Sequence, residues 1–422
     1  MDFLRLPEAP RLRLVNATVP GWLSGSAADL AGAVIAIEGD RIVADDGSGA
    51  TLDLRGAMVF PAFVDCHTHL DKGHIWRRRP NPDGTFAGAL GAVQGDSVTR
   101  WSEADLRARI DFGLRTAWAH GTRAIRTHLD TWMGQVEVTW PLFAEMRAEW
   151  SGRIDLQGAA LLGCDMVAPE GDFRRMADRV ADFGGVLGLF TYPMPDLPAR
   201  LCAFFEMAGA RATMTDFHAD ETLDPSVNTL RQIAEAALET GYDGAILAGH
   251  TCSLSVMPES EALDTLDLCA KAGVEMVSLP LCNLYLQDRQ RGRTPRNRGV
   301  TLVHEMKARG IAVSFASDNT RDPFYAYGDL DMIEVMREAT RICHLDHADP
   351  DWSRAFLASP AEACGFAAPS LAPGALADLV ICRARDWSEL YARPQSDRVV
   401  IRAGRQIDRM LPDYAELDHL ME

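Results

Sequence analysis

The sequence predicts an α/β fold in which a (β/α)8 barrel of the TIM type carries a small β-sandwich domain formed by both ends of the chain. Two observations predict it. Eight short apolar runs alternate with segments of helical length in the middle of the chain, as in a barrel whose parallel strands are each followed by a helix. Runs with the alternation typical of half-buried strands lie at both chain ends.

The chain ends carry the sandwich pattern. Apolar and polar side chains alternate between Gly and Asp turns over residues 12–19, 32–40, 51–54, 377–382 and 398–405. Because these runs lie outside the barrel repeat, we expect them to pair with one another. The predicted domains are therefore residues 1–58 and 367–422 together, and residues 59–366 for the barrel.

The eight predicted barrel strands are apolar runs that end in polar residues, at 58–65, 122–127, 154–160, 185–190, 212–217, 244–249, 274–279 and 311–316. Intervening segments such as 227–239 and 261–272 have the length and spacing of helices. A doubly wound open sheet is the structural alternative. It is less favoured because no glycine-rich phosphate loop follows an early strand.

Length and composition are those of a globular protein. The chain has 422 residues, of which 47% are hydrophobic and 24% charged, which excludes a largely disordered chain. A net charge of -18 argues against nucleic acid binding, which relies on attraction to phosphate. No signal-peptide pattern opens the chain, and no apolar run approaches the roughly 18 residues that span a bilayer. We therefore expect a soluble cytoplasmic protein with buried, unpaired cysteines that binds neither nucleic acid nor membranes.

Histidines and an aspartate stand where predicted barrel strands end. His67 and His69 end the first strand, and His218, His250 and Asp318 end the fifth, sixth and eighth. The chemistry of such barrels lies at the strand ends, and side chains at i and i+2 of an extended chain share a face. A lone histidine is more often structural, but this set from four strand ends predicts a site for one metal ion.

The predicted site has three imidazoles and one carboxylate around a divalent transition metal, with a position left for water. Such an ion lowers the pKa of its water from 15.7 toward about 7. Asp318 could bind the metal and hold the proton of the nucleophile, and His250 could orient the water or polarise the bond under attack. Glu221, three residues after His218, could carry a proton to a leaving amine.

Five stretches carry a resemblance to a known family: 63–71 (FVDCHTHLD), 126–130 (RTHLD), 218–221 (HADE), 283–289 (NLYLQDR) and 317–323 (SDNTRDP). The chain resembles the amidohydrolase superfamily, and within it the cytosine deaminase branch, from about residue 10 to residue 405. The resemblance implies a hydrolase of non-peptide C–N bonds of the kind used in nucleobase metabolism. By the same resemblance the metal ligands are His67, His69, His218 and Asp318, while Glu221 and His250 occupy the proton-shuttle and water-activating places.

The lysines bear on the number of metal ions. Binuclear members of the superfamily bridge two ions with a carbamylated lysine that ends the fourth strand. Lysine occurs here only at Lys72, Lys271 and Lys307, and none lies in or near residues 186–192. The resemblance therefore implies one divalent ion, and both zinc and iron suit a histidine-rich set.

Three departures from the cytosine enzymes concern the substrate. The segment 161–165 lacks the glutamine that recognises the pyrimidine edge, Asn319 replaces a second aspartate, and Phe324 replaces a tryptophan. A site that hydrogen-bonds a polar edge discriminates strongly, so we expect a substrate other than cytosine. The predicted substrate contacts are Gln287, which follows the seventh strand, with Asn319 and Phe324.

Two residues keep alternative interpretations. Lys72 reaches the substrate or forms a salt bridge in the first loop. His128, which ends the second strand, touches the pocket or makes a structural hydrogen bond to a neighbouring strand.

The predicted function is hydrolytic deamination of an aminated nitrogen heterocycle, a cytosine-like pyrimidine, a purine or a triazine, with hydroxide attacking the ring carbon that bears the amine. Residues 69–72 and 317–319 also resemble the N-isopropylammelide amidohydrolases, which remove an alkylamine from a triazine but lack a glutamate at the position of Glu221. Removal of an alkylamine or opening of a cyclic amide is therefore the alternative. A non-catalytic scaffold ranks last, because every ligand position is filled. We also expect a homo-oligomer.

Overall fold

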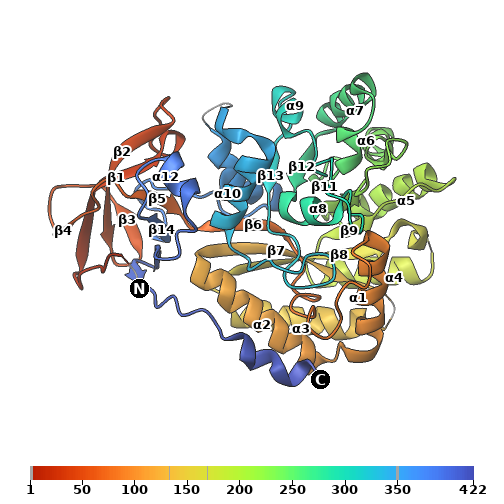
Figure 1. Ribbon diagram of the computed structural model, residues 1–422, viewed down its shortest axis with the longest axis horizontal. Helices are drawn as coiled ribbons and strands as arrows, with labels where there is room; N and C mark the ends of the chain where they lie inside the picture. The colour runs from red at the N-terminus through yellow and green to blue at the C-terminus, as the bar shows by residue number, and fades with distance from the viewer. Residues whose placement is uncertain (1–2, 133, 169, 348–350) are drawn as a thin grey trace.

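The computed structural model describes residues 3–132, 134–168, 170–347 and 351–422, and it contains both predicted sheets (Figure 1). One is a parallel barrel surrounded by helices, and the other is built from the two ends of the chain and lies beside it. The predicted fold class is confirmed. Among the described residues, no helix combines the length and the apolar character that crossing a bilayer requires.

The barrel strands follow one another in sequence order, each hydrogen-bonded in parallel to the next. They are β6 Phe63–Thr68, β7 Thr122–Asp130, β8 Asp155–Gly163, β9 Leu187–Phe190, β10 Thr215–Ala219, β11 Ile246–His250, β12 Val274–Ser278 and β13 Val313–Phe315. A parallel bridge between Thr68 and Asp318 joins the first strand to the segment that follows the last, so the barrel is closed at the ends of these strands.

The helices pack around this barrel (Figure 1). Two helices that the spacing predicts are capped in the ordinary way. Asn228 accepts a hydrogen bond from the Arg231 backbone amide at the start of α6, and Gly273 adopts a φ of 70° at the end of α7. The helices are α1 Phe86–Arg100, α2 Glu103–His120, α3 Val136–Glu149, α4 Asp172–Asp182, α5 Leu197–Ala210, α6 Thr229–Thr240, α7 Glu259–Ala272, α8 Pro280–Leu286, α9 Val303–Ala308, α10 Met332–Cys343, α11 Ala358–Cys364 and, beside the second sheet, α12 Trp387–Ala392.

The second sheet has the order β16-β15-β14-β5-β1-β2-β3, with β4 paired to β1. At its edge the Ile42 amide donates to the carbonyl of Ala375, and the Ala377 amide donates to that of Asp40, so the sheet curls over its own apolar core. Its strands are β1 Arg11–Pro20, β2 Leu30–Glu38, β3 Arg41–Val43, β4 Ala50–Asp53, β5 Met58–Pro61, β14 Leu379–Cys382, β15 Val399–Arg402 and β16 Arg405–Gln406.

The single strand predicted over 58–65 is in fact two strands in different sheets. β5 pairs with β14 and β1, whereas β6 begins the barrel. The Ala62 amide donates to the Asp378 carbonyl of one sheet, and the next amide, of Phe63, donates to Gly121 beside the barrel. A continuous apolar run that is buried throughout does not reveal which sheet it joins. The division of the chain into domains at 58 and 366 stays a prediction, with β5 belonging to the sheet of the chain ends.

The last residues return to the barrel. The 3-10 helix η6, Tyr414–Leu420, lies against α2 (Figure 1). The Tyr414 ring stacks on Phe112 at a centroid distance of 5.5 Å and its hydroxyl donates to Asp329, while Arg115 pairs with Glu416 at 2.6 Å. The sequence placed these residues with the chain-end sheet, because their charges and short apolar spacing give no sign of their partner.

A buried ion pair joins the chain-end sheet to the barrel. Arg398, just before β15, is 1% exposed and donates two hydrogen bonds of 2.6 Å to the carboxylate of Asp331, which caps α10. Burial acts to raise the pKa of Asp331, but Arg398 and then His120 outweigh it and hold this pKa far below its usual range. The pair therefore stabilises the fold above the pKa of an unfolded aspartate, about 3.9, and is lost as the pH falls below it.

Replacement of Asp331 by Asn should destabilise the protein by about 3–5 kcal/mol at neutral pH, because it keeps the helix cap but leaves a buried guanidinium without its counter-charge. The measurement is the urea midpoint of unfolding at pH 7 and at several pH values below about 3.9, over which the difference between the two proteins should shrink. Glu389→Gln, which removes the exposed partner of Arg385, is the matched control and should barely move the midpoint. An unchanged midpoint in Asp331→Asn would show that the ion pair does not hold the two sheets together.

Candidate active site

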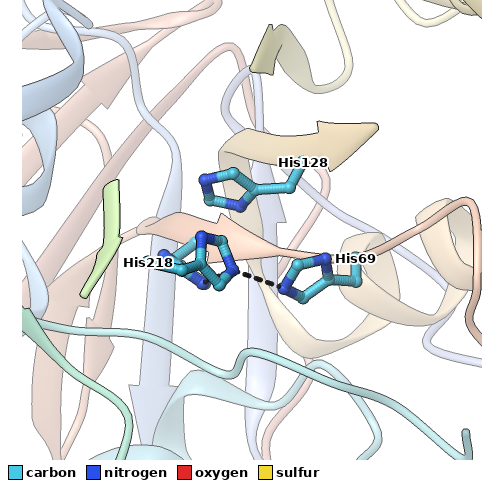
Figure 2. A group of neighbouring side chains, drawn as sticks. His69, His128 and His218 are labelled. Atoms are coloured by element: carbon cyan, nitrogen blue, oxygen red, sulfur yellow. Dashed lines mark hydrogen bonds between the residues drawn. The ribbon is translucent and has the colours of Figure 1, made fainter. Parts of the chain in front are cut away.

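Three histidines and one aspartate meet at the carboxyl ends of the barrel strands. His67 lies in β6, His69 directly follows that strand, His218 lies in β10 and Asp318 follows β13. The Nε2 atom of His218 is 3.1 Å from Nε2 of His67 and 3.1 Å from Nε2 of His69. Figure 2 shows the contact between His218 and His69, with His128 beside them.

The carboxylate of Asp318 completes this group. Its Oδ1 atom lies 3.5 Å from Nε2 of His67 and 3.3 Å from Nε2 of His69. Neither Asp318 oxygen has a hydrogen-bond partner among the described residues, although the side chain is buried. A buried carboxylate without partners is costly, unless a cation binds it. A tetrahedral ion with bonds of 2.0–2.1 Å spaces its ligand atoms about 3.3 Å apart, so these residues fit a divalent metal.

The protonation states favour the same use. Burial lowers the pKa of the His67, His69 and His218 imidazoles well below the usual range. The neighbouring histidines, and Lys72 in the case of His69 and His218, also disfavour a positive charge on these rings. Burial raises the pKa of Asp318 to about 8. The imidazoles are therefore neutral, which is the form that binds metal, and the carboxylate lacks only a cation to keep it ionised.

His128 belongs to the same cluster but is held from elsewhere. Its ring centroid lies 4.1 Å from that of His67, and one of its nitrogens is close enough to the three histidines to share an ion. Its Nε2 is 2.9 Å from the Asp216 carboxylate and its Nδ1 is 3.3 Å from the Thr68 carbonyl oxygen. Both nitrogens therefore face other acceptors, as in the structural interpretation of this residue.

Glu221 and His250 stand beside the cluster. Glu221 follows β10, and its Oε1 lies 3.5 Å from Nδ1 of His250, which ends β11. Burial, and then the charge of Asp318, raises the pKa of Glu221 well above its usual range, so the side chain is able to hold a proton. The two side chains and the metal cluster lie close together, as the sequence predicted.

The backbone is strained at these strand ends. His250 has a φ of 69° and Asp318 a φ of 63°, both in the left-handed region that non-glycine residues rarely adopt. Such conformations concentrate at functional sites, where the surrounding structure enforces them. Here they turn the chain at the points where it leaves the barrel and presents these two side chains.

A cavity of about 640 Å³ opens onto the cluster. Phe86 lies between Phe190 and Phe324, with ring centroids 5.5 and 5.4 Å away, and all three line this cavity. Aromatic walls of this kind suit a flat ring. Further lining residues include His69, Lys72, Leu90, Gln94, Ser97, Asp130, Trp132, Leu161, Leu162, Asp165, Met166, Tyr192, His218, Glu221, His250 and Asn319.

The three predicted substrate contacts are differently placed. Phe324 and Asn319 line the cavity, although the Asn319 amide already donates to Asp322 at 2.7 Å. Gln287 is not among the lining residues, and its amide donates to the backbone carbonyl of Glu221 at 3.1 Å. Contact of Gln287 with the substrate stays a prediction.

Lys72 forms a salt bridge, as in one of its two interpretations, and its contact with the substrate stays a prediction. Its ammonium lies 2.7 Å from the Asp130 carboxylate, and both side chains line the cavity. Burial acts to lower the pKa of Lys72, but Asp130 and Asp71 outweigh it and raise this pKa above its usual value. A charged, fully buried ammonium therefore faces the space where the substrate would lie.

Sequence reasoning missed several residues of the site. Phe86 and Phe190 were not singled out, because one lies in a helix and the other ends a strand without polar chemistry. Asn283 was quoted only within a matching stretch, yet its amide nitrogen lies 3.0 Å from Nδ1 of His250 and 3.4 Å from Oε1 of Glu221. Its place in the segment after the seventh strand was the available signal, but only contacts between distant segments bring it to His250.

Comparisons with known proteins agree with this site. The sequence profile of the amidohydrolase family matches residues 176–408. A pterin deaminase from Rhizobium rhizogenes is 49% identical over an alignment of 430 positions, which covers 99% of this chain and 98% of that protein.

Two solved structures share the fold. A 5-methylcytosine deaminase from Klebsiella pneumoniae superposes with a TM-score of 0.79 at 23% identity, covering 95% of this chain and 98% of that one. An N-isopropylammelide isopropylaminohydrolase from Burkholderia multivorans gives a TM-score of 0.72 at 24% identity, covering 94% and 97%. The family profile and the 49% identity to the pterin deaminase confirm the predictions of an amidohydrolase and of a hydrolytic deaminase. The chain belongs to the amidohydrolase family.

Proposed function

We propose that this protein is a pterin deaminase, which hydrolyses the C2–amine bond of a 2-amino-4-oxopteridine. Water supplies the oxygen that replaces the amine, and the products are ammonia and a 2,4-dioxopteridine. The observation that carries the reaction class is the partnerless Asp318 carboxylate among three neutral imidazoles, beside the buried Glu221. The substrate class is supported by the 49% identity to the pterin deaminase over nearly the whole of both chains.

The cavity supports a substrate larger than a single pyrimidine ring. Its volume of about 640 Å³ has room for a fused bicyclic ring with a substituent, and Phe86, Phe190 and Phe324 offer faces for stacking. The segment 161–165 lines the cavity with Leu161, Leu162, Gly163 and Asp165, and it lacks the amide expected for a cytosine enzyme. The two leucines add apolar surface for a wider ring, and Asp165 offers a carboxylate in place of that amide.

The metal ligands in this proposal are His67, His69, His218 and Asp318, which would hold one divalent ion, zinc or iron. Such an ion is a Lewis acid that makes water nucleophilic near neutral pH. The donor set of imidazole and carboxylate suits either metal. Lys72, which lines the adjoining cavity, is paired with Asp130, and residues 186–192 contain no lysine, which supports a single ion.

The protein residues then handle the ring and the protons. The aromatic rings hold the pteridine, and the ammonium of Lys72 can donate to its carbonyl oxygen. The Glu221 carboxyl gives a proton to the ring nitrogen next to C2 as the oxygen adds, and takes one from that oxygen for the departing amine. His250 orients the oxygen. Asp318, whose carboxylate lies beside Nε2 of His67 and His69, can hold the proton that the water loses.

Ammonia release from the zinc-loaded protein tests this directly. We expect turnover of pterin and of 6-substituted pterins, and much slower release from cytosine, adenine and ammelide. Alkylamine release from N-isopropylammelide, measured in the same assays, reports on the alternative reaction. Turnover of the triazine with no ammonia from any pterin would replace the proposed substrate class.

Replacement of Glu221 by Gln should lower kcat for the pterin by about 10²–10⁴-fold, because the amide cannot carry the proton. Bound metal, measured by mass spectrometry, should stay at the wild-type level, since Glu221 is not one of the proposed ligands. Glu235→Gln on the exposed face of α6 is the matched control and should leave kcat unchanged. A Glu221→Gln enzyme with wild-type kcat would remove this residue from the reaction.

The cytoplasmic location and the homo-oligomer remain predictions. The proposed reaction implies that the cavity binds a small nitrogen heterocycle.

A further inference from the structure

We infer that Asn283 is a positioning residue that keeps the proton of His250 on Nε2, so that His250 donates a hydrogen bond to the reacting oxygen and does not act as a base. The reaction in which this matters is the proposed one, but the hydrogen bond itself does not depend on that proposal. Sequence reasoning left open whether His250 orients the water or polarises the bond.

The argument begins with the amide nitrogen of Asn283. It lies 3.0 Å from Nδ1 of His250 and 3.4 Å from Oε1 of Glu221. An amide nitrogen has two hydrogens and no free lone pair, so it can only donate. Nδ1 of His250 must then be the acceptor, and a neutral ring that accepts at Nδ1 carries its hydrogen at Nε2.

The opposite orientation of the amide is disfavoured by Glu221. With the amide turned over, the oxygen of Asn283 would lie next to both Nδ1 of His250 and the Glu221 carboxyl group, so this orientation requires a hydrogen on both of them at once. Nδ1 of His250 is itself 3.5 Å from the Glu221 carboxyl group, too far for a good hydrogen bond. When Glu221 is ionised, the amide nitrogen is therefore the donor that serves both neighbours.

Burial makes this arrangement decisive. Asn283 is 1% exposed and His250 is 2% exposed, so bulk water does not compete for the hydrogen bond. The other ring nitrogen, Nε2, has no partner among the described residues. One nitrogen of this ring can reach the same point as His67 and Asp318, and Nε2 is the one left free to do so. The N–H therefore points to where oxygen would bind.

The seventh-strand segment holds Asn283 in this place. Asn283 lies in α8, the helix that follows β12. Its backbone carbonyl accepts a hydrogen bond of 2.9 Å from the backbone amide of Gln287. The side chain of Gln287 donates to the backbone of Glu221. Gly299, at a φ of 72°, packs so closely that a Cβ atom there would lie 2.3 Å from Cβ of Gln287 and 2.8 Å from the Asn283 carbonyl oxygen. α8 thus fixes Glu221 and His250 together.

It follows that His250 and Glu221 have different roles in the reaction. A His250 ring whose free nitrogen already carries hydrogen cannot accept a proton from the attacking water. It can stabilise negative charge on the oxygen as the C–O bond forms, which acts on the transition state more than on the bound substrate. Proton transfer is then left to Glu221 and Asp318.

The first test reads the ring directly. In zinc-loaded protein labelled with 15N in its 11 histidines, the His250 signals are assigned by their loss in His250→Gln. We expect an unprotonated Nδ1 and a protonated Nε2. Replacement of Asn283 by Asp, which is isosteric but can only accept, should reverse this tautomer. A protonated Nδ1 in the wild-type protein would overturn the inference, whether or not the variant folds.

The second test is kinetic, on a pterin that the wild-type enzyme deaminates. Asn283→Asp should lower kcat by about 10²-fold, as loss of a transition-state donor does, and leave KM nearly unchanged. Asn16→Asp makes the same chemical change at an exposed position of β1 in the chain-end sheet, and it should leave kcat unchanged. A reversed tautomer with wild-type kcat would overturn the role of His250 as a donor. Absence of pterin turnover in the wild-type enzyme would count against the proposed function alone, since the NMR result still decides the tautomer.

Discussion

The junction between the first and last barrel strands is the contact on which the site depends. The Asp65 carboxylate accepts hydrogen bonds from the amide of Ser317 at 3.1 Å and from its hydroxyl at 2.5 Å. The next amide, of Asp318, donates to the His67 carbonyl oxygen at 2.9 Å. These bonds join residues about 250 positions apart and fix the register in which the barrel closes. With any other register the carboxylate of Asp318 would not face His67 of β6 and His69, which directly follows that strand.

Closure in this register creates an unfavourable group of side chains in the apoprotein. Neutral imidazoles crowd around a carboxylate that accepts no hydrogen bond from a nitrogen or oxygen of the described residues, and the backbone enters the left-handed region at His250 and Asp318. The core does not require any of this, because apolar residues would fill the same space at lower free energy. Local conflict of this kind is typical of functional sites, where a ligand resolves it. A divalent cation held by these side chains would pair the carboxylate and bind the neutral imidazoles at one point.

The sequence predicted those parts of the site that depend on the geometry of a single strand. His67 and His69 share a face because of strand geometry, and the end of each barrel strand marks where chemistry can lie. Asn283, Phe86 and the Lys72–Asp130 pair depend on contacts between segments far apart in the chain, which no local pattern encodes. The same limit explains the strand predicted over 58–65, since both of its halves are buried apolar strands and only pairing assigns them to different sheets.

The most direct test of this account is the position of the metal. A crystal of the zinc-loaded protein, with diffraction recorded on both sides of the zinc absorption edge, gives the anomalous signal of the ion alone. We predict one peak, bonded to Nε2 of His67, His69 and His218 and to the carboxylate of Asp318 at about 2.0–2.2 Å. Two peaks, or a single peak bound by His128 in place of Asp318, would contradict the single site that barrel closure builds.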